Sequence, residues 1–204
     1  KSEWADDPCH VNCDCGRFIE IGNNVFMAYK NTEQGFEELK QKNVDFGGGL
    51  ERMAMAVLDD PDIFKIDLFT KSREILEKIT GKKYAENEKE TYAFRVILDH
   101  LRAATFLIAD GAVPSNKDQG YFTRRLIRRA VRYGNDLGMT DLFTKQVAQS
   151  YIDTYKDVYT DLVAQQDMIL SELEAEDTKF RITLESGIKE FEKFLKLKIK
   201  IKIL

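Results

Sequence analysis

The sequence has little of what marks specialised classes of protein. Its 204 residues include only 3 proline, 12 glycine, 3 cysteine and 2 histidine residues. So few prolines and glycines exclude collagen-like and low-complexity chains, and three cysteines do not suggest a disulfide framework. No run approaches the roughly 18 uncharged apolar residues of a membrane span, and the charged residues 1–7 are no signal peptide. We therefore expect a globular, cytoplasmic protein without a membrane partner.

The two signs of charge nearly balance. There are 31 basic and 35 acidic side chains, which give a formal net charge of -4. A chain with this balance binds nucleic acid only through a local basic patch. Hydrophobic residues make up 43% of the chain, enough for one ordinary domain or two small ones. The first residue is Lys1 rather than a methionine, so we expect the sequence to be a piece of a longer protein.

Hydrophobic periodicity divides the chain near Phe64 into a β-rich part and a longer helical part. Residues 17–29 are rich in Phe, Ile and Val and predict a strand, and the turn residues after them predict a hairpin. Two short strands are expected at 36–39 and 43–46, and the apolar spacing over residues 50–58 predicts a helix. Three apolar side chains of the first strand are expected to pack in the core: Val25, Phe26 and Met27.

From residue 67 onward the pattern is helical, which indicates an α+β fold that is predominantly α. Glycines at 81, 111 and 138 can end three of the helices in a left-handed conformation. The last nine residues, KLKIKIKIL, alternate lysine with leucine or isoleucine and predict a strand. Acidic residues near 172–177 are expected on a solvated helix face: Glu172, Glu174, Glu176 and Asp177. The expected helices cover residues 67–80, 89–110, 119–137, 141–159 and 160–194.

Residues 44–52, with the sequence VDFGGGLER, combine a strand end, three glycines and a helix start that carries Arg52. Glycine lets a backbone approach a ligand closely, and a helix N-terminus offers unpaired N–H groups and a partial positive charge. A guanidinium adds a fixed cation that matches phosphate. The segment is therefore typical of a nucleotide site, and a tight turn whose arginine pairs with a surface carboxylate is the alternative.

Residues 95–132 form a basic segment, which contains eight basic and three acidic side chains. The apolar stripe of the helix after Tyr121 predicts a buried face, so the arginines of this helix are expected on its flanks and outer face. Such a row can follow the phosphates of a nucleic acid, whereas pairing with nearby carboxylates is the alternative. The row consists of Arg124, Arg125, Arg128, Arg129 and Arg132.

The three cysteines lie close together in the segment DPCHVNCDCGRF, next to His10. Thiolates and imidazole are the ligands that zinc prefers, so a zinc site at Cys9, Cys13 and Cys15 is one interpretation. Reduced thiols in a loop are the other. His100 has no second ligand three or four residues away and is expected to pack in the interior rather than to bind metal.

Three segments, in this order, resemble the alanyl-tRNA synthetase family. They are RFIEIGNNVFMAY at 17–29, NVDFGGGLERMAMAVL at 43–58 and ILDHLRAATFLIADGAVPSNKDQGYFTRRLIRRAVRYG at 97–134. The resemblance implies part of a class II synthetase antiparallel sheet followed by a helical bundle. Residues 1–64, which include the Cys-rich segment, would be the C-terminal part of a class II catalytic domain. Residues 65–195 would be a helical tRNA-recognition domain, and residues 196–204 would be a strand-like tail or cut end.

The resemblance also implies roles for single residues. Arg52 would be catalytic by stabilising the triphosphate of ATP, which is used with Mg²⁺, and Asn116 would read the G·U pair of the tRNA acceptor stem. Gly22 stands where the family usually has tryptophan, and Phe-Gly-Gly at 46–48 replaces Thr-Gly-Met, which is expected to loosen packing around adenine or alanine. The implied ATP site contains Ile21, Gly22, Asn23, Gly47, Gly49 and Arg52. The implied alanine site contains Asn23 and Asp45. The implied tRNA site contains Asn116, Arg124, Arg125, Arg128, Arg129 and Arg132.

The function implied by the resemblance is that of a class II alanine–tRNA ligase. Such an enzyme activates alanine with ATP to alanyl-adenylate and transfers it to the 3′ end of tRNA(Ala), so the expected partners are tRNA(Ala), alanine and ATP, without DNA. The family's first two class II motifs would lie before Lys1, so the isolated chain is expected not to activate alanine. One alternative is a non-catalytic module that binds tRNA acceptor stems. Another is a small metal-binding protein centred on the cysteines.

Overall fold

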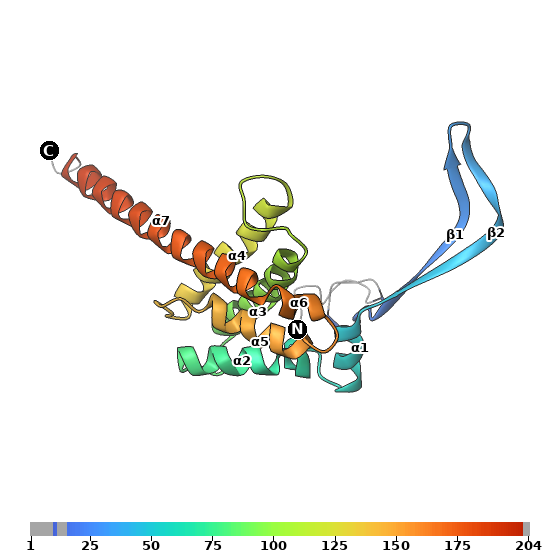
Figure 1. Cartoon of the computed structure of the whole chain (residues 1–204), viewed down its shortest axis with the longest axis horizontal. Helices are drawn as coiled ribbons and strands as arrows, with labels where there is room; N and C mark the ends of the chain where they lie inside the picture. The colour runs from blue at the N-terminus through green and yellow to red at the C-terminus, as the bar shows by residue number, and fades with distance from the viewer. Residues whose placement is uncertain (1–9, 12–15, 202–204) are drawn as a thin grey trace. The chain divides into compact units, whose positions relative to one another are not determined.

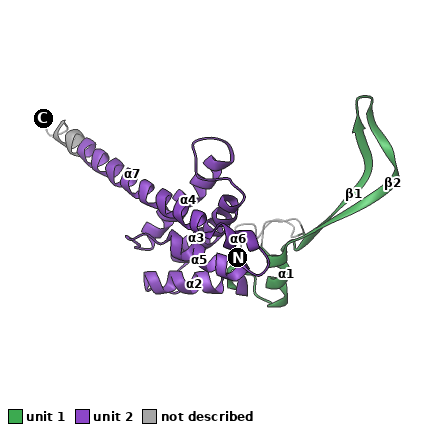
Figure 2. Cartoon of the chain, viewed as in Figure 1, with its two compact units in different colours: residues 1–66 green, residues 67–204 purple. Residues whose placement is uncertain are grey.

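The computed structural model describes residues 10–11 and 16–201. The chain divides into two compact units, Lys1–Ile66 and Asp67–Leu204 (Figure 2). The first contains an antiparallel hairpin and short helices, and the second consists of packed helices (Figure 1). The predicted α+β class, predominantly α, is confirmed.

The hairpin of the first unit is formed by β1 (Gly22–Thr32) and β2 (Gly35–Gly48). Gly35 adopts a φ of +114°, a conformation that favours glycine, and the Thr32 hydroxyl donates to its carbonyl oxygen at 2.8 Å. The strand pairing is irregular after Met27, which pairs with Asn43, because the next pair joins Tyr29 to Glu38. The two strands predicted at 36–39 and 43–46 are therefore one strand, whose pairing is interrupted between them.

The apolar side chains of β1 are not in a core. Val25 is 53%, Phe26 76% and Met27 42% exposed, so the prediction that they pack in the interior is wrong. A two-stranded ribbon cannot bury side chains on both of its faces, and among the described residues the sheet has no third strand.

Two short helices follow the hairpin in the same unit. α1 (Leu50–Val57) begins directly after Gly49, as its apolar spacing predicted. η1 (Ile63–Lys65) is a single 3₁₀ turn whose start is capped by Asp62, which accepts a hydrogen bond from the Phe64 amide at 3.0 Å.

The second unit consists of α2 (Asp67–Thr80), α3 (Glu88–Ala109), α4 (Asp118–Asp136), α5 (Thr144–Tyr155), α6 (Thr160–Ala164) and α7 (Gln166–Ile201). α3 and α4 pack most closely against each other, and α7 contacts α3, α4 and α5. Each leucine or isoleucine in this core contributes about 1.5–3 kcal/mol through its burial. Fully buried side chains of the core include Phe94, Leu98, Leu101, Ile108, Ile127, Tyr151 and Leu173.

The ends of three helices follow the glycine signals of the sequence. Gly81, Gly111 and Gly138 have φ angles of +68°, +86° and +90°, the left-handed conformation that ends α2, α3 and α4. The predicted helix at 141–159 is shorter, Thr144–Tyr155. The predicted helix at 160–194 is broken at Gln165, whose side-chain amide donates to the Ala109 carbonyl of α3 at 2.9 Å.

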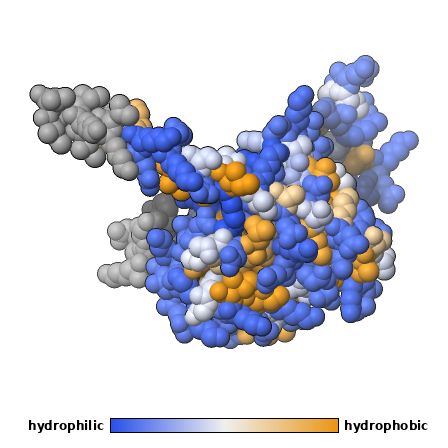
Figure 3. Space-filling model, turned by 60° about the vertical axis from the view of Figure 1, so that its left-hand side comes forward, coloured by the Kyte–Doolittle hydropathy of each residue, from blue (hydrophilic) through white to orange (hydrophobic). Residues whose placement is uncertain are grey.

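The strand predicted at the end of the chain is wrong for residues 196–201, because α7 continues through Ile201. Extending an existing helix adds one hydrogen bond per residue, whereas a strand requires a partner. Figure 3 shows hydrophilic residues over most of the visible face, with apolar residues gathered in smaller patches. None of the helices in the described part of the chain combines the length and the hydropathy needed to cross a bilayer.

Candidate functional site

The register of the hairpin brings the residues expected to bind ATP and alanine to one end of β1 and β2. Asn23 pairs with Gly47, and Val25 pairs with Asp45. Because side chains alternate between the faces of a strand, Asn23 and Asp45 share a face as diagonal neighbours about 7–8 Å apart. No atom lies within 4 Å of a Cβ built on Gly47, so the face is open between the amide and the carboxylate. Such a pair can hold a small group that carries a positive charge and hydrogen-bonding atoms.

The start of α1 lies against the start of β1. The Gly49 amide donates to the Ile21 carbonyl at 3.0 Å, and no side chain caps the helix. Arg52 Nη1 donates to the Glu20 carbonyl at 2.8 Å and lies 3.9 Å from the Glu20 carboxylate. Half of the Arg52 side chain is still exposed, at 51%. The uncapped helix start and the guanidinium together suit an anion, while the Glu20 contact is the carboxylate pairing of the alternative interpretation.

On the opposite face of the hairpin, Phe46 covers two glycines. A Cβ on Gly22 would lie 2.8 Å from Phe46 Cε2, and one on Gly48 would lie 3.1 Å from Phe46 Cε1. The ring therefore fills the space into which a side chain at position 22 would extend. Sequence reasoning named Gly22 and Phe46 as separate departures from a pattern, and the structure places them in contact on one face of the hairpin.

In the second unit, the loop between α3 and α4 carries Asn116. The Ser115 amide donates to the Gly120 carbonyl at 3.0 Å, and the Ser115 hydroxyl donates to the Lys117 carbonyl at 2.8 Å. A Cβ on Gly120 would lie 2.3 Å from the Val113 carbonyl oxygen, so only glycine lets the loop lie this close to the first turn of α4. This packing leaves Asn116 exposed at the tip.

Asn116 is connected to α7 through Arg124. Arg124 Nη1 donates to Asn116 Oδ1, and its Nε lies 3.3 Å from Glu176 Oε1. Arg128 Nε donates to the same carboxylate oxygen at 2.6 Å. Glu176 is only 4% exposed. Arg124 and Arg128, which were expected on the flanks or outer face of α4, therefore turn inward to a buried carboxylate, as the alternative of pairing with nearby carboxylates predicted.

The prediction of a solvated acidic face on α7 is wrong for Glu176 and Asp177. Asp177 is fully buried, accepting hydrogen bonds from Thr144 Oγ1 at 3.1 Å and from Arg181 Nε at 2.8 Å. A buried carboxylate is tolerated when cations and donors surround it, as here. Glu174 stays at the surface, where it pairs with a lysine.

Three arginines of α4 form an exposed row: Arg125, Arg129 and Arg132. They are spaced at i, i+4 and i+7, so they share one helix face. Arg125 lies over the ring of Tyr121 at 5.8 Å, and Arg129 and Arg132 lie over the ring of Tyr133 at 5.9 and 5.4 Å. In the part of the chain that the structure describes, none of the three makes an ion pair with a carboxylate. Their charges remain available to an anion.

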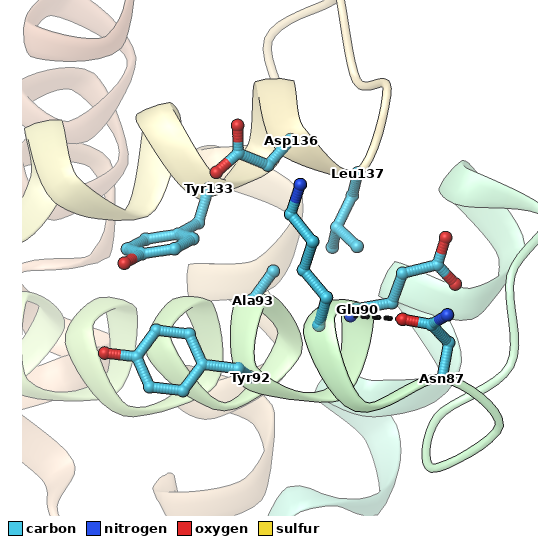
Figure 4. Close-up of a pocket in the computed structure, with 8 residues that line it drawn as sticks. Asn87, Glu90, Tyr92, Ala93, Tyr133, Asp136 and Leu137 are labelled. Carbon is cyan, nitrogen blue, oxygen red and sulfur yellow. Dashed lines mark hydrogen bonds between the residues drawn. The ribbon is translucent and has the colours of Figure 1, made fainter.

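Sequence reasoning missed a pocket of about 220 Å³ between the start of α3 and the end of α4 (Figure 4). The Tyr92 and Tyr133 rings meet edge to face at 5.5 Å, and Arg129 Nη2 donates to the Tyr92 hydroxyl at 3.3 Å. The pocket therefore adjoins the arginine row, although none of the predicted site residues lines it. The lining residues are Asn87, Lys89, Glu90, Tyr92, Ala93, Tyr133, Asp136 and Leu137.

The metal predictions have separate outcomes. Cys9, Cys13 and Cys15 lie outside the described residues. Within residues 10–11 and 16–201, no group of three histidine, cysteine or acidic side chains could hold a metal ion. His100 is mostly buried, and its hydrogen bond with Asp99, at 2.9 Å, lowers the pKa of the Asp99 carboxyl.

The chain is similar to known proteins. The family described as "tRNA synthetases class II (A)" matches residues 3–204. An alanine–tRNA ligase of Borrelia hermsii is 41% identical over 190 residues, which are 92% of this chain and 32% of that protein. One from Carboxydothermus hydrogenoformans is 44% identical over 181 residues, which are 88% of this chain and 21% of that protein. The chain thus spans a third or less of the length of these curated relatives. It belongs to the class II (A) family of tRNA synthetases.

Proposed function

We propose that this chain is part of an alanine–tRNA ligase and that its second unit binds the acceptor stem of tRNA(Ala). The observation that carries the proposal is the exposed row Arg125, Arg129 and Arg132, which has no ion pair with a carboxylate among the described residues and lies on the helix against which the Asn116 loop packs. The names of the relatives and the family match support this substrate class.

In this proposal the three arginines bind phosphates and Asn116 reads the G·U pair. Guanidinium groups pair bidentately with phosphate, and those stacked on tyrosine are already oriented. The wide, shallow minor groove of an RNA helix exposes base edges to an amide at the tip of a loop. Phosphate contacts give affinity and position, whereas the amide gives selectivity.

The first unit is proposed to bind ATP and alanine. Asp45 faces the ammonium group of alanine, Asn23 hydrogen-bonds beside it, and Arg52 stabilises the negative charge of the triphosphate, which is bound with Mg²⁺. The alanine carboxylate attacks the α-phosphorus, and the bond to pyrophosphate breaks. The terminal ribose hydroxyl of the tRNA then attacks the carbonyl carbon of the adenylate and releases AMP. The protein contributes positioning and electrostatic stabilisation to both steps.

The test is binding of the 204-residue chain to an acceptor-stem minihelix with the G·U pair, beside a G·C control, across a salt series. Replacing Arg129 with glutamine should weaken binding to both helices and reduce the salt slope by about 1. Lys71→Gln, an exposed charge on α2, is the matched control and should change neither. Asn116→Ala should remove only the preference for G·U. If Arg129→Gln behaves as Lys71→Gln does, the row is not the phosphate contact.

A non-catalytic acceptor-stem module is the second candidate, because Asn116 and the exposed arginine row belong to a unit with its own core. The ligase and the non-catalytic module are distinguished by measuring alanine-dependent exchange of pyrophosphate into ATP, with the protein that carries this chain. Exchange that Asp45→Asn abolishes supports the ligase. RNA binding without exchange supports the module.

A further inference from the structure

The orientation of the Asn116 side chain is fixed by Arg124. A guanidinium offers donors only, so the amide oxygen of Asn116, not its nitrogen, must face Arg124 Nη1. The oxygen has two lone pairs, and Arg124 uses one of them. An amide without this donor could turn over and present its nitrogen in place of its oxygen.

Arg124 is fixed in turn by Glu176. The Arg124 side chain is only 12% exposed, and its Nε lies 3.3 Å from Glu176 Oε1. This contact is an ion pair rather than a hydrogen bond, because Nε makes no hydrogen bond among the described residues. Arg128 approaches the same oxygen from the next turn of α4. Without the carboxylate, two guanidinium groups would face each other in a largely buried place, and their repulsion would drive them apart.

We infer that Glu176 is a positioning residue for RNA reading: it holds Arg124, which sets the Asn116 amide with its oxygen ready to accept from the RNA. The inference rests on the proposed function. In a G·U wobble pair the guanine 2-amino group is not bound by the partner base, so it can donate to an acceptor in the minor groove. The second lone pair of Asn116 Oδ1 is such an acceptor. Glu176 contributes to selectivity without touching the RNA.

The experiment compares Glu176→Gln with Glu174→Gln in the 204-residue chain. Both variants remove one negative charge from the same helix, but Glu174 pairs at the surface with Lys145, at 3.2 Å, and its side chain is 43% exposed. The dissociation constants for the G·U and G·C minihelices are measured for each variant. Glu176→Gln should lower the preference for G·U at least about fivefold, the value of one well-formed hydrogen bond. Glu174→Gln should keep the preference, and binding of the G·C helix should change equally in both variants.

Two further measurements keep the test decisive if Glu176→Gln folds poorly. Arg124→Lys keeps the charge, but an ammonium cannot reach Glu176 and Asn116 together, so the same loss of preference is expected. The NMR signals of the Asn116 side-chain amide, assigned by their loss in Asn116→Ala, should shift or broaden in Glu176→Gln without RNA and stay unchanged in Glu174→Gln.

The outcomes separate this inference from the proposed function. If the wild-type chain does not prefer the G·U helix, the proposed reading of the acceptor stem fails, and the inference fails with it. If the wild-type chain prefers G·U and Asn116→Ala abolishes the preference, while Glu176→Gln and Arg124→Lys both keep it, the inference alone is overturned.

Discussion

Replacing Gly120 with alanine tests how the loop that carries Asn116 is held on α4. The added Cβ would lie 2.3 Å from the Val113 carbonyl oxygen and 2.4 Å from Ser115 Oγ. The carbonyl is part of the backbone, so it cannot rotate away and the loop must shift outward. Overpacking of this kind costs about 1–3 kcal/mol. The higher helix propensity of alanine offsets up to about 1 kcal/mol of this cost, so we expect a net loss of stability of up to about 2 kcal/mol.

Gly187→Ala is the control for this substitution. Gly187 lies inside α7, and a Cβ there meets no atom within 4 Å, so alanine should stabilise the protein by about 0.5–1 kcal/mol. Urea unfolding followed by circular dichroism gives both free energies. The shifted loop should also reduce the preference of Gly120→Ala for the G·U minihelix. Equal stability of the two variants, with the preference intact, would refute the reasoning.

Asp177→Ala should destabilise the protein by about 3 kcal/mol in urea unfolding, because it leaves a partly buried arginine unpaired, whereas Glu174→Ala should change stability by less than about 0.5 kcal/mol. Gly22→Ala should speed amide hydrogen exchange in the β1–β2 pair by clashing with Phe46, and Phe46→Ala should remove that effect; exchange that is equally fast in the double variant would contradict the contact. Burial raises the pKa of Glu77, but hydrogen bonds from a backbone amide and a lysine outweigh it and lower the pKa overall. The stability that Glu77 contributes is therefore complete above its unfolded pKa of about 4.3 and is lost as the pH falls through the lower folded pKa. A Glu77→Gln variant should be less stable than the wild type at pH 7, and the difference should shrink steadily as the pH falls below about 4.3.

Local signals in the sequence predicted the local structure well. The glycines at 81, 111 and 138 end their helices because a left-handed residue is easiest for glycine, a property of the residue alone. The hairpin and α1 also follow from neighbouring residues. The break at Gln165 was missed: at this position the side chain bonds the Ala109 carbonyl, which lies 56 residues earlier in the chain, a contact that no local pattern indicates.

In the candidate site, too, the sequence predicted what depends on neighbouring residues and missed what depends on distant ones. Antiparallel pairing brought Asn23 and Asp45 to one face, at the end of the hairpin away from its turn. Glu176 and Asp177 looked like surface residues because their spacing carries no sign of the arginines that surround them. Likewise, the sequence of α4 does not reveal which of its five arginines turn inward, because that depends on where α7 packs.

The ion pair between Arg128 and Glu176 joins residues that are 48 positions apart in the chain. A ribosome adds about 5–20 residues per second, and α4 ends 40 residues before Glu176, so the synthesis of α4 is complete about 2–8 s before that of Glu176. During that interval the exposed arginines of α4 already attract phosphate, while Arg124 has no carboxylate to hold it. Under the proposed function, a nascent chain would therefore gain its affinity for RNA before its selectivity, and the docking of α7 on α4 would be the folding step at which it begins to distinguish one acceptor stem from another.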